Sequence, residues 1–192
     1  MAISLKKGEN VNLAKAAPGV QKFRIGCGWD ARATAGEKFD LDASAFALAD
    51  TGKCASETDL VFYGAPEHSS TAIKHTGDNR TGDGAGDDES IIVDVSKMPA
   101  GIKKIAVTVT IDQAEARRQT FGMVNNAYVR IVDETTGTEV ARYDLSEDYS
   151  VETALIFGEL YNHNGEWKFK AIGQGFANGL KGLCDNFGVA TE

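Results

Sequence analysis

Apolar and polar residues alternate with a period of two along much of the chain, and this pattern constrains the fold more than any other feature. Residues 22–29 and 104–111 place apolar side chains at every second position, as strands with one buried face do. Near their end, residues 41–48 are apolar at successive positions instead of at every second one, which is typical of a strand covered on both faces. Further apolar runs of strand length occupy residues 60–63, 91–95 and 127–132.

A hairpin is predicted late in the chain. Residues 154–161 and 166–172 have strand-like composition, and the segment between them contains Asn164-Gly165. Asn-Gly is a strong signal for a tight turn between antiparallel strands. Trp167, Phe169 and Ala171 are expected on the inner face.

Helix-forming segments are scarce. Residues 113–119 are rich in helix formers and follow Asp112, a residue type that caps helix N-termini well. Residues 178–187 are a second candidate for a short helix. Many short strands with few helices predict an all-β fold, a β-sandwich of two sheets with one or two short helices. No repeat or linker divides the chain, so we expect one domain over residues 1–192.

Composition and charge exclude several classes of protein. The formal net charge of −8 argues against a nucleic-acid surface, which needs clustered Lys and Arg. The N-terminus lacks the apolar core of a signal peptide, and no apolar run approaches the roughly 18 residues of a membrane span. Cys27, Cys54 and Cys184 form no Cys-x-x-Cys pair, so we expect reduced thiols and a cytoplasmic location.

Residues 75–89 are unusually acidic and rich in glycine. They hold five carboxylates, four glycines and one arginine, and they carry −4 of the formal charge. Carboxylates packed this densely repel one another unless a cation lies among them. Glycines allow the backbone to direct the oxygens toward one point. Calcium requires six to eight oxygen ligands, so this segment predicts a calcium site.

Two known loop patterns do not fit the acidic segment. Reading Asp78 as the first residue of an EF-hand places Glu89 correctly, but Arg80 and Gly82 then occupy ligand positions. A phosphate-binding P-loop needs Gly-Lys-Ser/Thr, whereas Gly86 is followed by Asp87. The remaining alternative is a solvated acidic loop that holds no ion.

Further acids occur near the ends of two predicted strands. Asp30 ends one strand, and Asp40 and Asp42 lie two residues apart on one face of another. If these regions converge with the acidic segment, the oxygen donors exceed the needs of one ion, so we expect about two calcium ions. Few histidines and no paired cysteines argue against zinc and copper. The predicted ligands are Asp30, Asp40, Asp42, Asp78, Asn79, Asp83, Asp87, Asp88 and Glu89.

The motifs resemble those of the TerD family of tellurium-resistance and stress-response proteins, and of the related slime-mould cyclic-AMP-binding proteins. The longest matching string is Gly-Asp-Asn-Arg-Thr-Gly-x-Gly-x-Gly-Asp-Asp-Glu, at residues 77–89. Matching segments extend in order over nearly the whole chain. The others are residues 28–32, 39–44, 75–76, 116–122, 141–145, 152–154, 157–161 and 164–170.

The resemblance implies a calcium-binding β-sandwich in a bacterial cytoplasm, and it implies the same nine ligands. It also implies a role in resistance to tellurite, phage and pore-forming colicins. Partners would be other proteins of the tellurite-resistance system, including a membrane component. Asp112 marks one departure, because the family often has one more residue between Thr110-Ile111 and its Asp, and we leave Asp112 outside the ligand set.

Three functions follow from these observations. The first is a non-enzymatic, calcium-dependent binding module. The second is a metal-dependent phosphoester hydrolase, for which His75 is the one histidine beside the acidic segment, and we expect that histidine to be structural. The third is a receptor for a cyclic nucleotide or another small ligand, suggested only by the slime-mould relatives.

Overall fold

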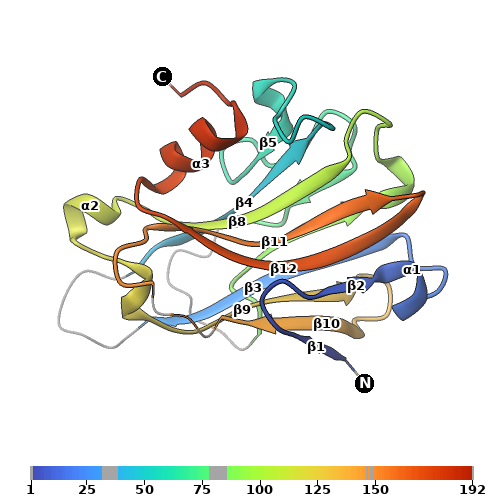
Figure 1. The fold of residues 1–192 in the computed structure, drawn as a ribbon, viewed down its shortest axis with the longest axis horizontal. Helices are drawn as coiled ribbons and strands as arrows, with labels where there is room; N and C mark the ends of the chain where they lie inside the picture. The colour runs from blue at the N-terminus through green and yellow to red at the C-terminus, as the bar shows by residue number, and fades with distance from the viewer. Residues whose placement is uncertain (1, 32–38, 78–85, 146, 148, 192) are drawn as a thin grey trace.

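Two six-stranded sheets face each other in the computed structural model, which describes residues 2–31, 39–77, 86–145, 147 and 149–191 (Figure 1). The first sheet has the order β1-β10-β9-β3-β7-β6, and the second has the order β2-β12-β11-β8-β4-β5. Among the described strands, β1 and β10 pair in parallel and the other neighbours are antiparallel. The predicted β-sandwich is therefore confirmed.

The strands of the first sheet are β1 (Ile3–Leu5), β3 (Lys22–Ala31), β6 (Ile73–His75), β7 (Glu89–Asp94), β9 (Val124–Asp133) and β10 (Glu139–Asp144). Those of the second are β2 (Asn10–Asn12), β4 (Leu41–Leu48), β5 (Leu60–Val61), β8 (Lys104–Ile111), β11 (Ala154–His163) and β12 (Glu166–Phe176). The α-helices are α1 (Leu13–Ala16), α2 (Ala114–Arg117) and α3 (Gly179–Phe187), and short 3-10 turns occupy Glu57–Asp59, Val95–Lys97 and Phe121–Met123.

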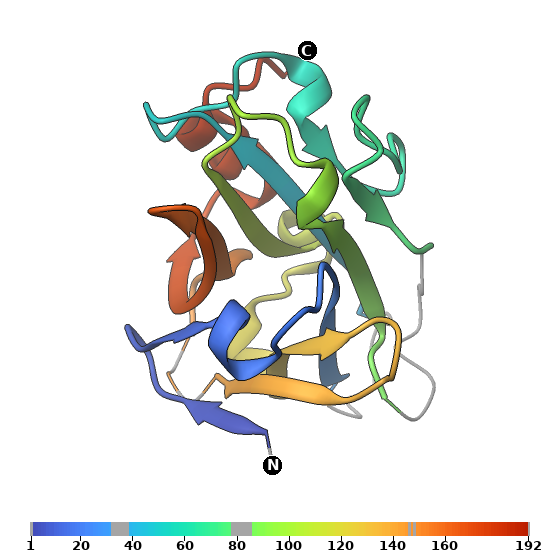
Figure 2. The ribbon, with the colours of Figure 1, turned by 90° about the vertical axis from the view of Figure 1, so that its right-hand side faces the viewer.

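The core lies between the sheets, and the alternating positions of β3 build one wall of it. Phe23, Ile25, Cys27 and Trp29 are all buried there, as the period of two predicts. Leu41 and the alanines of β4 meet them from the second sheet. Figure 2 shows the two layers after a quarter turn.

Helix α3 covers part of the outer face of the second sheet. Phe46 and Leu48 of β4 pack there against Leu183 and Phe187 of the helix, and the rings of Phe46 and Phe187 have centroids 4.7 Å apart. This confirms that β4 is covered on both faces at its end. Toward the start of β4, α3 no longer covers the strand, and the outer face becomes polar.

The predicted turn of the β11–β12 hairpin is confirmed. His163 pairs with Glu166, so Asn164 and Gly165 form a two-residue loop. Their φ angles of 55° and 82° are the left-handed values that a type I′ turn requires at both positions. The backbone N–H of Gly165 donates a hydrogen bond to Asn162 Oδ1 at 3.0 Å.

Two local expectations were wrong in detail. The strand expected over residues 60–63 ends at Val61, because Phe62 and Ala65 exchange backbone hydrogen bonds of 3.1 and 3.0 Å that turn the chain. The residue at the N-cap position of the helix after Asp112 is Gln113, which has a φ of 48° and whose side chain makes no capping hydrogen bond. Asp112 does not cap it, because its carboxylate pairs with Arg117 Nη2 at 3.3 Å.

Within the described part of the chain, no helix combines the length and the apolar character needed to cross a lipid bilayer.

Candidate metal centre

The structure describes six of the nine predicted ligands. Asp78, Asn79 and Asp83 lie outside the described residues. The others come from the end of β3, the start of β4 and the start of β7. They are Asp30, Asp40, Asp42, Asp87, Asp88 and Glu89.

Asp87 is held between two arginines on the outer face of the first sheet. Arg24 Nη1 lies 3.1 Å from Asp87 Oδ2, and Arg130 Nε lies 2.6 Å from Oδ1. The Asp87 side chain is only 3% exposed, so both ion pairs are partly shielded from water. The hydrogen bond to Asp87 raises the pKa of Arg130 further above its ordinary value. The two ion pairs of the Asp87 carboxylate therefore hold the backbone just before β7 in place.

Tyr128 completes this arrangement. Its hydroxyl donates a hydrogen bond to the carbonyl oxygen of Gly86 at 2.7 Å and lies 3.3 Å from Asp87 Oδ1. Burial, followed by the nearby charge of Asp87, raises the pKa of Tyr128 to about 12. The phenol therefore stays a hydrogen-bond donor, and it fixes the backbone just before Asp87.

Gly26 and Gly28 leave the space that these contacts occupy. They alternate on the outer face of β3, and a Cβ atom at Gly26 would overlap the Asp87 carboxylate. A Cβ atom at Gly28 would overlap the ring of Tyr128. The Gly-Cys-Gly sequence of β3 therefore serves close approach rather than an unusual backbone conformation.

Asp88 is fixed to the end of β3. Its backbone N–H donates to the carbonyl oxygen of Cys27 at 2.8 Å, and its Oδ2 accepts a hydrogen bond from the Trp29 N–H at 2.8 Å. Burial raises the pKa of Asp88, the Trp29 hydrogen bond opposes that change, and the nearby charges of Asp30, Asp87 and Glu89 raise it further. Negative charge is therefore concentrated at this point.

Glu89 points inward, between the sheets. Its Oε2 accepts hydrogen bonds from the backbone N–H of Ala43 on β4 and from His75 Nε2 at 3.3 Å. The Gly77 N–H donates to His75 Nδ1 at 3.1 Å, so the ring proton lies on Nε2, facing Glu89. The Glu89 and His75 side chains are both fully buried, and together they connect β6, β7 and β4.

Asp30 and Asp88 line the same small cavity, where β3 ends and β9 begins. The cavity has a volume of about 240 Å³ and is lined by Trp29, Asp30, Gly86, Asp88, Asn126, Tyr128 and Arg142. Asn126 Nδ2 donates to Asp30 Oδ2 at 2.7 Å. Arg142 stacks over the Tyr128 ring, 3.7 Å from its centroid, and bonds to Asp144. The cavity thus offers carboxylate and amide oxygens beside one cation that already has partners.

Asp40 and Asp42 lie apart from this cavity. Asp42 pairs with Thr110 across β4 and β8 and lines a larger cleft on the outer face of the second sheet. The carbonyl oxygen of Asp40 accepts a hydrogen bond from the Asp112 N–H at 2.8 Å. Asp112 therefore lies beside Asp40, one of the predicted ligands, although the sequence analysis left Asp112 outside the ligand set.

The structure brings some of the predicted ligands together and separates others. Within the described ranges, no three His, Cys, Asp or Glu side chains form a group able to hold an ion. Asp30 and Asp88 meet at one cavity, Asp42 faces another, and Asp87 and Glu89 anchor the backbone. The convergence of nine ligands stays a prediction, since three of them lie outside the described residues.

Sequence reasoning missed the residues that hold the acidic segment. Arg24, Arg130 and Tyr128 occupy outward positions of β3 and β9, where alternation alone indicates solvent exposure. The paired glycines of β3 were the available signal, because glycine inside a strand often marks a close approach.

Known proteins resemble this chain over nearly its full length. A family model described as the TerD domain matches residues 1–187. Tellurium resistance protein TerD of Serratia marcescens is 54% identical over 189 residues, covering 98% of each chain. General stress protein 16U of Bacillus subtilis (strain 168) is 52% identical over 190 residues, again covering 98% of each.

A solved structure supports the same fold. The homologue of telluride resistance protein (TerD) from Streptomyces coelicolor A3(2) superposes with a TM-score of 0.65 at 21% identity. The match covers 84% of this chain and 93% of that one. With the family model matching almost the full length, the chain belongs to the TerD family.

Proposed function

We propose that this protein is a calcium-binding, non-enzymatic module of a bacterial tellurite-resistance and stress-response system. Calcium organises the acidic segment, and the ordered surface then binds partner proteins. The names of its relatives support the general role, since they include tellurium resistance proteins, a general stress protein and a chemical-damaging agent resistance protein.

The observation that carries the proposal is the anchoring of three successive acids. Asp87 is held on the outer face of the first sheet, Asp88 on the end of β3, and Glu89 in the interior. This anchoring fixes the acidic segment where it enters β7. It also sets the Asp88 carboxylate in the cavity that Asp30 lines.

The donor chemistry of that cavity fits calcium. Carboxylate, amide and carbonyl oxygens are available from Asp30, Asp88, Asn126 and Gly86, and none of the seven lining residues is His or Cys. Hard oxygen donors suit calcium and magnesium, and calcium accepts the larger number of protein ligands. Burial and then the neighbouring carboxylates raise the pKa of Asp88, and bound calcium would offset the charge of those carboxylates.

The chain's own residues have two kinds of task in this mechanism. Arg24, Arg130 and His75 hold Asp87 and Glu89, and they thereby fix the backbone around Asp88. The oxygen atoms that would bind calcium come from Asp30 and Asp88, with Asp40, Asp42, Asp78, Asn79 and Asp83 as the further predicted donors. Asp87 and Glu89 contribute to the proposed site chiefly by fixing the backbone on either side of Asp88.

The same contacts support a non-enzymatic role. A hydrolase would need a base near the metal that can reach substrate. His75 is the histidine beside the acidic segment, and its side chain is fully buried with both ring nitrogens hydrogen-bonded. These contacts support a structural role for His75.

We propose that the partners are other proteins of the resistance system, including a membrane component, and that the protein acts in the cytoplasm. Calcium would stabilise the folded form because it binds the native state in preference to the unfolded chain.

Isothermal titration calorimetry with calcium tests this proposal. The double variant Asp30→Asn/Asp88→Asn keeps side-chain size and removes charge, so we expect calcium affinity to fall by about tenfold or more, or 1.4 kcal/mol per tenfold. Asp50→Asn changes an exposed acid in a turn outside the cavity and should bind calcium as the unmodified protein does. Equal affinity in all three proteins would exclude the site.

A further inference from the structure

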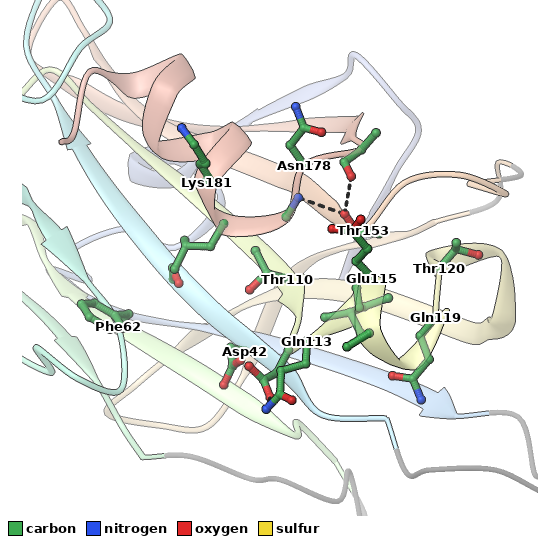
Figure 3. Close-up of a pocket in the computed structure, with 18 of the residues that line it drawn as sticks. Asp42, Phe62, Thr110, Gln113, Glu115, Gln119, Thr120, Thr153, Asn178 and Lys181 are labelled. Atoms are coloured by element: carbon green, nitrogen blue, oxygen red, sulfur yellow. Dashed lines mark hydrogen bonds between the residues drawn. The ribbon is translucent and has the colours of Figure 1, made fainter. Parts of the chain in front are cut away.

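Asp59, His68 and Ser70 form a hydrogen-bonded chain outside the site described above. His68 Nε2 lies 3.1 Å from Asp59 Oδ1, and His68 Nδ1 lies 2.7 Å from Ser70 Oγ. None of the three lines either of the cavities described above. The larger of these, the cleft on the outer face of the second sheet, is lined instead by residues that include Asp42 and Thr110 (Figure 3). The chain of three side chains is therefore a separate feature of the molecule.

The hydrogen bonds of His68 fix its tautomer. The backbone N–H of Ser70 donates to His68 Nδ1 at 3.1 Å, so this nitrogen is an acceptor and the proton of the neutral ring lies on Nε2. Nε2–H then donates to Asp59, and the Ser70 hydroxyl donates to Nδ1. A serine that donates to a histidine, which in turn donates to a carboxylate, is the order of groups in an activated serine nucleophile.

Asp59 is held rigidly as the third member of the chain. Its Oδ2 accepts hydrogen bonds from the backbone N–H groups of Ala55 and Ser56, at 2.8 and 3.0 Å, while its Oδ1 faces His68. The Asp59 side chain is 14% exposed and the His68 side chain is 5% exposed. A fixed and shielded carboxylate keeps the imidazole in one orientation, and it stabilises the positive charge that the ring gains when it takes up a proton.

Ser70 lies in a tight and strained turn that leads into β6. The His68 N–H donates to the Ile73 carbonyl oxygen at 3.0 Å, and the Thr71 N–H donates to the His68 carbonyl oxygen at 2.8 Å. Thr71 has a φ of 60°, which is unfavourable for a β-branched residue, and such strain is concentrated at functional sites. The Ala72 N–H donates to Ser70 Oγ at 3.2 Å, and a donor at this oxygen favours its deprotonated form.

The main alternative is that these contacts only stabilise the turn. A serine in a turn often accepts a hydrogen bond from a backbone N–H two residues further on, as Ser70 does from Ala72. That role does not require a buried histidine that is itself held by a carboxylate. The two explanations differ in the reactivity that they predict for the Ser70 hydroxyl.

We propose that Ser70 is an activated nucleophile and a modification site, which takes an acyl group from a small activated ester. Ser70 is partly exposed and lies between the exposed residues Ser69 and Thr71, so an ester can approach from solvent. Because Ser70 lines neither cavity described above, the donor is small and makes few contacts. One transfer to the protein's own serine is a modification and not turnover, so it leaves the proposed non-enzymatic role unchanged.

The transfer balances without a further reactant. As Ser70 Oγ forms a bond to the acyl carbon, its proton passes to His68 Nδ1, and Asp59 stabilises the resulting imidazolium. The bond between the acyl carbon and the leaving oxygen then breaks, and that oxygen takes the proton from Nδ1. The products are O-acylated Ser70 and the free alcohol, and no electron is transferred.

Tandem mass spectrometry after brief exposure to p-nitrophenyl acetate tests the proposal, with Ser69 as an internal control. Ser69 is adjacent and more exposed, but it makes no hydrogen bond to a histidine within the described part of the chain. We expect Ser70 to be acetylated about tenfold faster than Ser69 or more, since a positioned base contributes about 10²- to 10⁴-fold. In urea-unfolded protein the two serines should react at similar rates, because His68 is no longer held beside Ser70.

Matched variants identify the base. Ser70→Ala should abolish the fast acetylation and His68→Asn should slow it about tenfold or more, whereas Ser69→Ala should leave it unchanged. Circular dichroism checks that each variant is folded. If His68→Asn does not fold, the comparison of Ser70 with Ser69 in native and unfolded protein still decides. Equal acetylation of the two serines in the folded protein, or of neither, would overturn the proposal. An undiminished rate at Ser70 in folded His68→Asn would do the same.

Discussion

The outer faces of the two sheets differ in whether their polar side chains have partners within the protein. On the first sheet, Asp87 is sandwiched between Arg24 and Arg130, which also pair with Glu134 and Glu139 at 3.1 Å. On the second sheet, Ser44 and Thr110 stay without partners in the described chain and open into a cleft. Polar groups satisfied by the protein hold a segment in place, whereas polar groups left to solvent are available for a ligand.

Among the variants considered, replacing Gly26 by Val is expected to cause the largest loss of stability. The new side chain would occupy the space of the Asp87 carboxylate and force it away from both arginines. Overpacking and the loss of a buried ion pair should together lower the free energy of unfolding by about 3 kcal/mol or more. Urea denaturation monitored by circular dichroism measures the change.

Gly101→Ala is the control for that variant, because nothing lies within 4 Å of a Cβ atom there. It should alter stability by less than about 0.5 kcal/mol. A similar loss in both variants would show that the close approach of Asp87 is not what requires Gly26.

Removing calcium should produce the next largest change. If free calcium is a hundredfold above its dissociation constant, binding adds about 2.7 kcal/mol to the free energy of unfolding. EDTA should then lower the melting temperature by roughly 5–10 °C for a chain of this size. Hydrogen exchange should rise at residues 28–30 and 86–90 and stay unchanged at residues 166–172 of β12, which contain none of the proposed ligands. An unchanged melting curve would contradict calcium binding.

Arg130→Met should cost somewhat less, because Arg24 still pairs with Asp87. Truncating one partner of a carboxylate that is only 3% exposed leaves poorly compensated charge, so we expect a loss of about 2 kcal/mol in unfolding free energy. Arg142→Met removes a pair with Asp144, whose side chain is 61% exposed, and the stacking of Arg142 over Tyr128, and together these should cost about 1 kcal/mol. Equal losses would mean that the Asp87 ion pairs have no special stabilising role.

The sequence predicted the parts of the fold that depend on local pattern. The alternation in β3 and β8, the double burial of β4 and the Asn164-Gly165 turn are all properties of neighbouring residues. The three-residue strands β1 and β2 were missed because they are too short to show a period. They form because β10 and β12 present edges for pairing.

The candidate site was less predictable, for a physical reason. Acid-rich composition identified the segment, but the roles of its members depend on residues far away in sequence. Arg24 and Asp87 are 63 positions apart and Glu89 bonds a backbone group 46 positions away. Composition cannot tell an acid that anchors the chain from one that faces a cavity. The cleft beside Thr110 likewise depends on where α3 stops, which no strand pattern encodes.

The smallest effect on stability is expected for Thr110→Val. This variant tests directly whether polar groups on the outer face of the second sheet stabilise the fold. Valine matches threonine in shape, and the Thr110 hydroxyl makes no hydrogen bond to the described residues, so the free energy of unfolding should change by less than about 0.5 kcal/mol or should rise. Thr108→Val on the same strand removes a buried hydrogen bond to the Ser44 carbonyl oxygen at 3.4 Å and should lower it by about 1 kcal/mol. Urea denaturation of both variants gives the two values. A loss at position 110 as large as that at 108 would mean that the Thr110 hydroxyl stabilises the fold as much as a hydrogen-bonded one, and the contrast between the two outer faces would then fail.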